Sequence, residues 1–208
     1  MKNLVIEQNE SILIVAPHPD DESIGCGGLL IKYPYNCSVW VLTDGRFGCV
    51  KGRESETADR RANEFKTEMN SLGIDDYRMF GIYDTTLPDN TQLLIHEDFT
   101  CFDRVFVTNK YDEHPDHAAA YQIVRNAINY QGYKGRLFQY EVGTPLTKGT
   151  CILDITDVID KKCELIAMNQ SQMEMLDYTK ISRCLNSFRA EYLGKKGYFV
   201  ERYYEEIN

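Results

Sequence analysis

Histidine is scarce in this chain, which has four among its 208 residues. Long apolar runs are also missing, since none approaches the ~20 residues that a membrane-spanning helix requires. The first ten residues are too polar for a secretory signal peptide. We therefore expect no membrane span and a cytoplasmic location.

The formal net charge of −9 argues against a nucleic-acid partner or an anionic membrane surface, since both need a basic face. The sequence also has no Cys-x-x-Cys pair, and its seven cysteines are an odd number. These features argue against a disulfide framework or a thiolate zinc site. We expect the cysteines to be reduced and mostly buried. They are Cys26, Cys37, Cys49, Cys101, Cys151, Cys163 and Cys184.

Short apolar, β-branched runs predict buried strands. The clearest cover residues 11–16, 38–43 and 104–108, and further strands are expected over 137–142 and 151–155. With no linker, repeat or low-complexity stretch between them, residues 1–208 are expected to form a single domain.

Helical patterns lie between the predicted strands. Apolar residues from Ala58 to Leu72 recur every three or four positions, and Gly73 would cap that helix. A second stripe begins at Ala120 and ends near Gly132, and a third long helix is expected from Asp157 to about Met175. Alternating strands and helices predict an α/β fold, with a mostly parallel sheet and helices on both of its faces.

Three of the four histidines lie in two short motifs, and only His96 is elsewhere. The first motif is Ala16-Pro17-His18-Pro19-Asp20-Asp21-Glu22, directly after the strand at 11–16. The second, His114-Pro115-Asp116-His117, follows the strand at 104–108 by a few residues. In parallel α/β sheets, ligands bind at the carboxyl ends of the strands, so the two motifs can meet there.

Together the motifs offer two imidazoles and a carboxylate, a ligand set that open catalytic zinc sites use. We predict His18, Asp21 and His117 as ligands of one divalent metal, Zn²⁺ in the first place, with a fourth position left for water. Asp20 is then suited to act as the general base. His114 could be a ligand too, but a protonated His114 that stabilises an oxyanion fits a three-ligand site better. Asp116 is predicted to orient a histidine ring.

A glycine-rich segment, Gly25-Cys26-Gly27-Gly28, also follows the first strand. Its spacing does not match the dinucleotide-binding pattern, and the carboxylates just before it would repel a pyrophosphate. We interpret these glycines as sites of close contact between a helix and the sheet.

The two histidine motifs resemble those of the LmbE-like, or PIG-L-like, de-N-acetylases. Weaker similarities include Thr43-Asp44-Gly45, Arg61-x-x-Glu64, Gly81-x-x-Asp84, Asp154-Ile155-Thr156-Asp157 and Ser171-Gln172. The resemblance implies a Rossmann-like three-layer sandwich and a zinc-dependent enzyme that removes acetyl groups from N-acetylglucosamine-type sugars. It implies the same ligands and general base, and makes Arg61 and Asp84 contacts to substrate. A homo-oligomer is expected by analogy only.

This chain departs from the family pattern at two positions. Some relatives have a tyrosine two residues before the second motif, whereas this chain has Asp112 there and Tyr111 one residue earlier. Where relatives often carry histidine near Ser171, this chain has Asn169. The first change leaves open which residue donates a proton to the leaving amine.

The sequence thus predicts a hydrolase that deacetylates an N-acetylated amino sugar or its conjugate. Two alternatives stay open. One is a metal-dependent hydrolase that cleaves another amide, an ester or a phosphoester. The other is a non-catalytic sugar-binding protein with the same fold, against which the presence of Asp20 argues.

Overall fold

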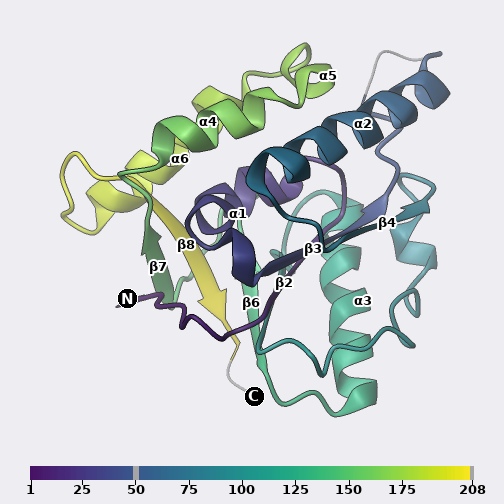
Figure 1. Cartoon of the computed structure of the whole chain (residues 1–208), viewed down its shortest axis with the longest axis horizontal. Helices are drawn as coiled ribbons and strands as arrows, with labels where there is room; N and C mark the ends of the chain where they lie inside the picture. Colours follow the sequence, from purple (N-terminus) through teal and green to yellow (C-terminus); the bar gives the residue numbers. More distant parts are fainter. Residues whose placement is uncertain (49–51, 207–208) are drawn as a thin grey trace.

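The computed structural model describes residues 1–48 and 52–206, so Cys49 lies outside the described residues. Eight strands form one sheet in the order β1-β7-β8-β6-β5-β2-β3-β4 (Figure 1). Their bounds are β1 Lys2–Asn3, β2 Ile12–Ala16, β3 Cys37–Thr43, β4 Tyr77–Ile82, β5 Arg104–Thr108, β6 Arg136–Tyr140, β7 Cys151–Asp154 and β8 Val200–Glu205.

Most strand pairs are parallel, and β8 is the exception because it runs antiparallel to both β6 and β7. The order β4-β3-β2-β5-β6 is that of a doubly wound sheet, whose direction of winding reverses between β2 and β5. The predicted α/β fold with a mostly parallel sheet is therefore confirmed.

Six α-helices connect the strands among the described residues. They are α1 Asp21–Lys32, α2 Glu54–Leu72, α3 Pro115–Gln131, α4 Ile159–Ala167, α5 Gln170–Met173 and α6 Tyr178–Tyr192. Short 3-10 turns add Pro34–Asn36 and Leu87–Asp89. In these parts of the chain no helix combines the length and apolarity needed to cross a membrane.

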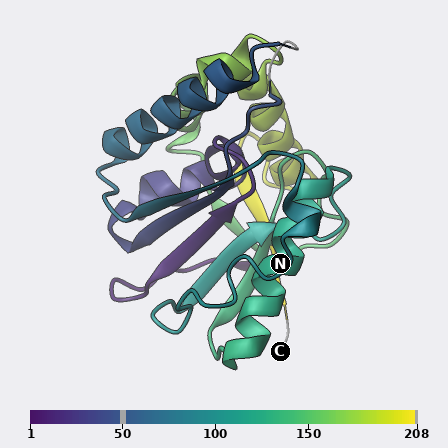
Figure 2. The ribbon, with the colours of Figure 1, turned by 90° about the vertical axis from the view of Figure 1, so that its right-hand side faces the viewer.

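Alternation along β2 separates the two apolar layers. Ile12, Ile14 and Ala16 pack with residues of α1, α2 and α4, whereas Leu13 and Val15 pack with residues of α3. Figure 2 shows α2 and α3 on opposite sides of the sheet. All five residues of β2 are buried, as expected for a central parallel strand covered on both faces.

The ends of two helices are as the sequence predicts. Gly73 and Gly132 follow α2 and α3 with φ of 70° and 62°, and each backbone N–H bonds to carbonyls of the last turn. The glycines of α1 also pack closely, as interpreted. A Cβ on Gly25 would lie 2.2 Å from the ring of Tyr140, and one on Gly28 would lie 2.3 Å from Ile155.

The predicted long helix from Asp157 to Met175 is wrong. The chain forms α4, leaves helical geometry at Asn169 (φ −80°, ψ 60°), and resumes as the short α5. Asn169 instead donates a 2.7 Å hydrogen bond from its Nδ2 to Glu68 of α2. Asparagine is a weak helix former because its side chain competes for such bonds.

Half of the described cysteines are buried, so the expectation that most would be is only partly met. Cys26, Cys37 and Cys151 are buried, whereas Cys101 and Cys184 are exposed and Cys163 is intermediate. All six are free thiols, which agrees with the reduced state expected from the sequence.

A pair of buried carboxyl groups, Glu22 and Glu68, lies at the first motif. Glu22 and Glu68 are fully buried, and Glu22 accepts a hydrogen bond from the backbone N–H of Asp20. Oε1 of each glutamate has no hydrogen-bond partner among the described groups. Burial raises the pKa of Glu68 to about 8 and, with the charge of Glu68, raises the pKa of Glu22. A proton held between the two carboxyls would satisfy both oxygens.

This pair predicts a pH-dependent stability. Because Glu68 ionises near pH 4.5 when unfolded and near pH 8 when folded, the folded state binds more protons between those values. Stability should therefore fall as the pH rises through that window, by up to about 1.4 kcal/mol per unit. Urea unfolding at pH 5 to 8 should show a shallower pH dependence for Glu68→Gln than for the parent.

The control is Glu56→Gln, which changes an exposed glutamate of the same helix and should keep the parent slope. Equal slopes for Glu68→Gln and the parent would show that the buried pair holds no extra proton.

Candidate metal and catalytic site

Strand pairing brings the two histidine motifs together. In β2, Val15 pairs with Val107 of β5, and both strands end within a few residues of a motif. The first motif is further fixed by β3, because Thr43 donates to the Pro17 carbonyl from both its backbone N–H and its hydroxyl, each at 2.9 Å. Residues almost a hundred positions apart therefore meet at the point where the sheet changes direction.

Asp20 occupies a strained backbone position between β2 and α1. Its φ of 121° and ψ of −25° lie in a region that non-glycine residues rarely adopt. This conformation lets the chain turn from the strand directly into α1, whose first residue is Asp21. The two adjacent carboxylates consequently have different surroundings.

The predicted ligand atoms converge on one point. Oδ2 of Asp21 lies 3.2 Å from Nδ1 of His18 and 3.3 Å from Nε2 of His117, and the two nitrogens are 3.3 Å apart. A tetrahedral zinc ion with bonds of about 2.0–2.1 Å separates its ligand atoms by about 3.3–3.4 Å. The triangle thus fits one face of such a coordination sphere, and its donor types are those that zinc takes.

Carboxylates face the opposite nitrogen of each histidine. Nε2 of His18 lies 3.0 Å from Asp84 and 3.3 Å from Asp116, and Nδ1 of His117 lies 3.3 Å from Asp112. Such contacts orient the rings of metal-binding histidines and make them more basic. Asp116 is itself held by the backbone N–H groups of Thr85 and Leu87, at 2.7 and 3.2 Å.

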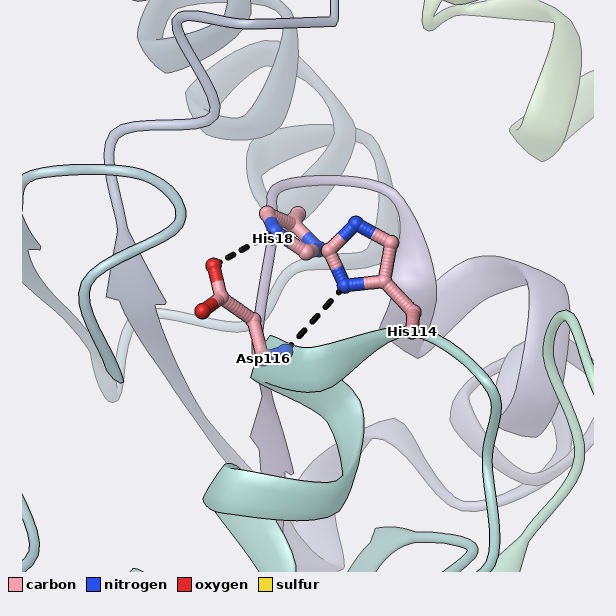
Figure 3. A group of neighbouring side chains, drawn as sticks. All are labelled: His18, His114 and Asp116. Atoms are coloured by element: carbon pink, nitrogen blue, oxygen red, sulfur yellow. Dashed lines mark hydrogen bonds and ion pairs between the residues drawn. The ribbon is translucent and has the colours of Figure 1, made fainter. Parts of the chain in front are cut away.

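A second group of three side chains, His18, His114 and Asp116, also lies close enough to hold a metal (Figure 3). Its atoms are already engaged within the protein. Nδ1 of His114 accepts the backbone N–H of Asp116 at 3.2 Å, and the Asp116 carboxylate accepts two backbone N–H groups. Oδ2 of Asp21 also accepts a backbone N–H, that of His18 at 3.0 Å, so burial is the clearer difference. All three residues of the group with Asp21 and His117 are buried, whereas His114 is exposed, which makes that group the better candidate metal site.

Electrostatics favours charge on the donor groups of this site. Burial lowers the pKa of His117, but Asp21 and Asp112 outweigh that effect and raise it to about 9. For His18, burial is likewise outweighed, by hydrogen bonds to Asp116, Asp21 and Asp84, and the pKa is raised. Burial opposes ionisation of Asp21, yet the two histidines hold its pKa well below the usual range. In the absence of a metal ion, these pKa shifts favour protonated His18 and His117 next to an ionised Asp21.

Asp20 has a different environment. Its burial raises its pKa to about 6, against the opposing charge of Arg61 and with help from Asp21. Nη2 of Arg61 donates to Oδ1 of Asp20 at 3.0 Å and to the Pro19 carbonyl at 2.6 Å, while Nη1 donates to the Gly45 carbonyl. Arg61 therefore holds this carboxylate and its loop in place.

His114 caps the N-terminus of α3, and its ring packs next to the rings of both predicted histidine ligands. Its ring centroid lies 4.9 Å from that of His18 and 4.7 Å from that of His117. Burial and the neighbouring histidines lower the pKa of His114. This argues against the protonated imidazole that the sequence suggests, which stays a prediction. In a neutral ring with Nδ1 accepting the cap bond, the proton would lie on Nε2.

Neither candidate proton donor before the second motif reaches the cavity described below. Asp112 is buried, and its carboxylate accepts the backbone N–H groups of His114 and Thr144. Tyr111 is 70% exposed and lines a separate small cavity. Asp112 has instead become a contact of His117, which sequence reasoning missed.

A cavity of about 440 Å³ opens beside the ligand triangle. Its lining includes seven residues that the sequence predicts for the site: His18, Asp20, Asp21, Arg61, Asp84, His114 and His117. Other lining residues, such as Phe47, Thr85, Tyr178 and Ile181, were not predicted as site residues. Gln172 also lines the cavity, and the sequence analysis named it only as part of a weak similarity to the family. Tyr178 and Ile181 come from α6, a helix that the sequence reasoning did not predict.

Comparison with known proteins finds similarity to deacetylases of N-acetylated sugars. A probable N-acetyl-alpha-D-glucosaminyl L-malate deacetylase 2 of Bacillus anthracis is 29% identical over 193 residues, covering 80% of this chain and 83% of the relative. The N,N'-diacetylchitobiose deacetylase structure from Pyrococcus horikoshii superposes with a TM-score of 0.75 and 23% identity, covering 95% of this chain and 84% of that one.

The same fold also occurs in a protein of different chemistry. GalB, a 4-carboxy-2-hydroxymuconate hydratase from Pseudomonas putida, superposes with a TM-score of 0.71 at 19% identity, over 96% of this chain and 97% of its own. Fold alone therefore does not identify the reaction. The family model described as PIG-L, GlcNAc-PI de-N-acetylase, however, matches residues 13–128 and so includes both motifs. Since that match spans more than half of the sequence, the chain belongs to the PIG-L family.

Proposed function

We propose that this protein is a zinc-dependent hydrolase that removes the N-acetyl group from an N-acetylglucosamine-type sugar or conjugate. The observation that carries the proposal is the triangle of His18, Asp21 and His117, with Asp20 and His114 beside the same cavity. The relatives support the proposal, because several of them are named as deacetylases of N-acetylated sugars. We also propose that the enzyme acts in the cytoplasm, which its free cysteines favour.

The proposed roles follow from where each group lies. His18, Asp21 and His117 would hold the zinc ion, which when bound supplies a Lewis acid and lowers the pKa of a coordinated water. Asp20, fixed by Arg61, accepts a proton from the attacking water at its carboxylate. The Nε2–H of His114 donates a hydrogen bond to the oxygen of the acetyl group as negative charge develops there.

Arg61 and Asp84 keep their proposed place at the substrate. Both line the cavity, and each also contacts groups of the protein itself: Arg61 contacts Asp20, and Asp84 contacts His18 and the backbone N–H of Phe47. We propose that they border the sugar while they position these partners. Asp116 orients His18 in the same way.

A non-catalytic binding protein is the weaker alternative. Backbone strain such as that of Asp20 costs of order 1–3 kcal/mol and persists where function requires it. A protein that only held a sugar would have no use for a strained, buried carboxylate next to its metal ligands.

The ligand assignment predicts that His117→Ala loses most of its bound metal. Elemental analysis of chelator-treated protein reconstituted with zinc should give about one metal per chain for the parent and far less for this variant. His96→Ala, which removes an exposed histidine, should bind zinc like the parent. Full metal content in His117→Ala would contradict the assignment.

Substitution of the two adjacent aspartates should have different effects on zinc binding and turnover. Asp20→Asn keeps the ligand triangle and should retain zinc, while turnover falls by roughly two to four orders of magnitude, the scale of general-base loss. Asp21→Asn should lose zinc affinity itself. Measurements of zinc content and acetate release on both variants test this, and equal metal loss in the two would refute the division of roles.

His114 should act on the chemical step rather than on metal binding. Its loss removes a hydrogen bond to the oxyanion, so kcat should fall roughly a hundred- to a thousandfold with KM and zinc content little changed. His114→Asn is the sharper variant, because asparagine can still cap α3. If zinc is lost together with activity, His114 is a ligand and the proposed role is wrong.

A further inference from the structure

The residues that line the cavity fall into two chemically different groups. Histidine and aspartate side chains lie at and around the ligand triangle. The other group is apolar or aromatic, namely Ile24, Phe47, Val142, Leu176, Tyr178 and Ile181. Three of these come from the α5–α6 region, which lies above α1 in Figure 1. With the acetamide of a sugar at the ligand triangle, the apolar and aromatic residues of the α5–α6 region remain available to the group that is attached to the sugar.

Two of the apolar side chains remain open to solvent while they line the cavity. Leu176 is 54% exposed and Ile181 is 44% exposed. Their backbone is well held: the N–H of Leu176 bonds to the Gln172 carbonyl at 3.1 Å, and Asp177 caps α6 through a 3.0 Å bond from Lys180. When a ligand covers ordered apolar surface beside such a cavity, the burial of that surface stabilises the complex.

Apart from the histidines of the ligand triangle, the described lining of the cavity offers little positive charge to an anionic aglycone. Within the described residues, Arg61 is the one lysine or arginine that lines the cavity. It is 4% exposed and already donates to Asp20 and to the carbonyls of Pro19 and Gly45. Asp20 and Asp84 contribute negative charge to the same space. Among the described residues that line the cavity, no lysine or arginine is therefore left to pair with a carboxylate or phosphate on the aglycone.

From these observations we propose that Leu176, Tyr178 and Ile181 form an aglycone subsite for an uncharged alkyl or aryl group linked to the N-acetylated sugar. This inference rests on the proposed deacetylase function and narrows its substrate class. The sugar would present its acetamide to the ligand triangle. Its apolar substituent would cover Leu176 and Ile181, with Tyr178 offering a ring face for contact. The site would then discriminate against glycosides with an acidic substituent, such as malate.

The test compares acetate release by the zinc-loaded enzyme from methyl, butyl, phenyl and malyl N-acetylglucosaminides. Each fully buried methylene is worth about fourfold in affinity, so three partly buried ones should raise kcat/KM for the butyl glycoside roughly 5- to 20-fold over the methyl glycoside. The phenyl glycoside should behave similarly. The malyl glycoside should be no better than the methyl glycoside.

In the variants Leu176→Ser and Ile181→Ser, the ratio of kcat/KM for the butyl glycoside to that for the methyl glycoside should fall to about 1. Phe188→Ser is the matched control: it removes a 56% exposed apolar residue seven positions along α6 from Ile181, outside the cavity lining. It should keep the parent's preference.

Each outcome has a separate meaning. Acetate release from none of the glycosides would refute the proposed function itself. Release from the methyl glycoside without a butyl or phenyl advantage, or a preference for the malyl glycoside, would refute the apolar subsite alone. A butyl advantage that survives both serine variants would also refute it.

Discussion

The parallel pairing of β2 with β5 is the constraint on which the rest of the site depends. These strands flank the point where the sheet reverses its winding, so the segments that leave them diverge to opposite faces. That divergence opens the space in which His18, Asp21 and His117 can face one another. It also explains why α1 and α3 begin there: each helix starts at a motif and packs on its own side of the sheet.

Burying so many ionisable groups in one place is tolerable only because they neutralise one another. Each histidine of the triangle lies between carboxylates, and Arg61 balances Asp20. An isolated buried charge would cost several kcal/mol, whereas paired and hydrogen-bonded charges cost far less. The mutual compensation also fixes ring orientations, since a rotated imidazole would leave a carboxylate without its partner.

Local sequence patterns were sufficient where a residue's role depends on its neighbours along the chain. Buried strands such as β2, the glycine ends of α2 and α3, and the two histidine motifs could all be predicted in that way. The α5–α6 region could not. Its helix is interrupted at Asn169, whose side chain bonds to Glu68, a residue about a hundred positions away, and nothing in the local sequence pattern records that bond. For the same reason Tyr178 and Ile181 were missed in the cavity, and Asp112 was not recognised as a partner of His117.

The strained backbone of Asp20 has a consequence for how such a protein responds to selection. At φ 121° a glycine would have less backbone strain than an aspartate, and burying the carboxylate of Asp20 destabilises the folded state further. If Asp20 is the general base proposed above, stability and catalysis favour different residues at position 20. Laboratory evolution that rewards heat tolerance or soluble yield, without a requirement for turnover, would drift away from aspartate there and erode the active site while improving the fold.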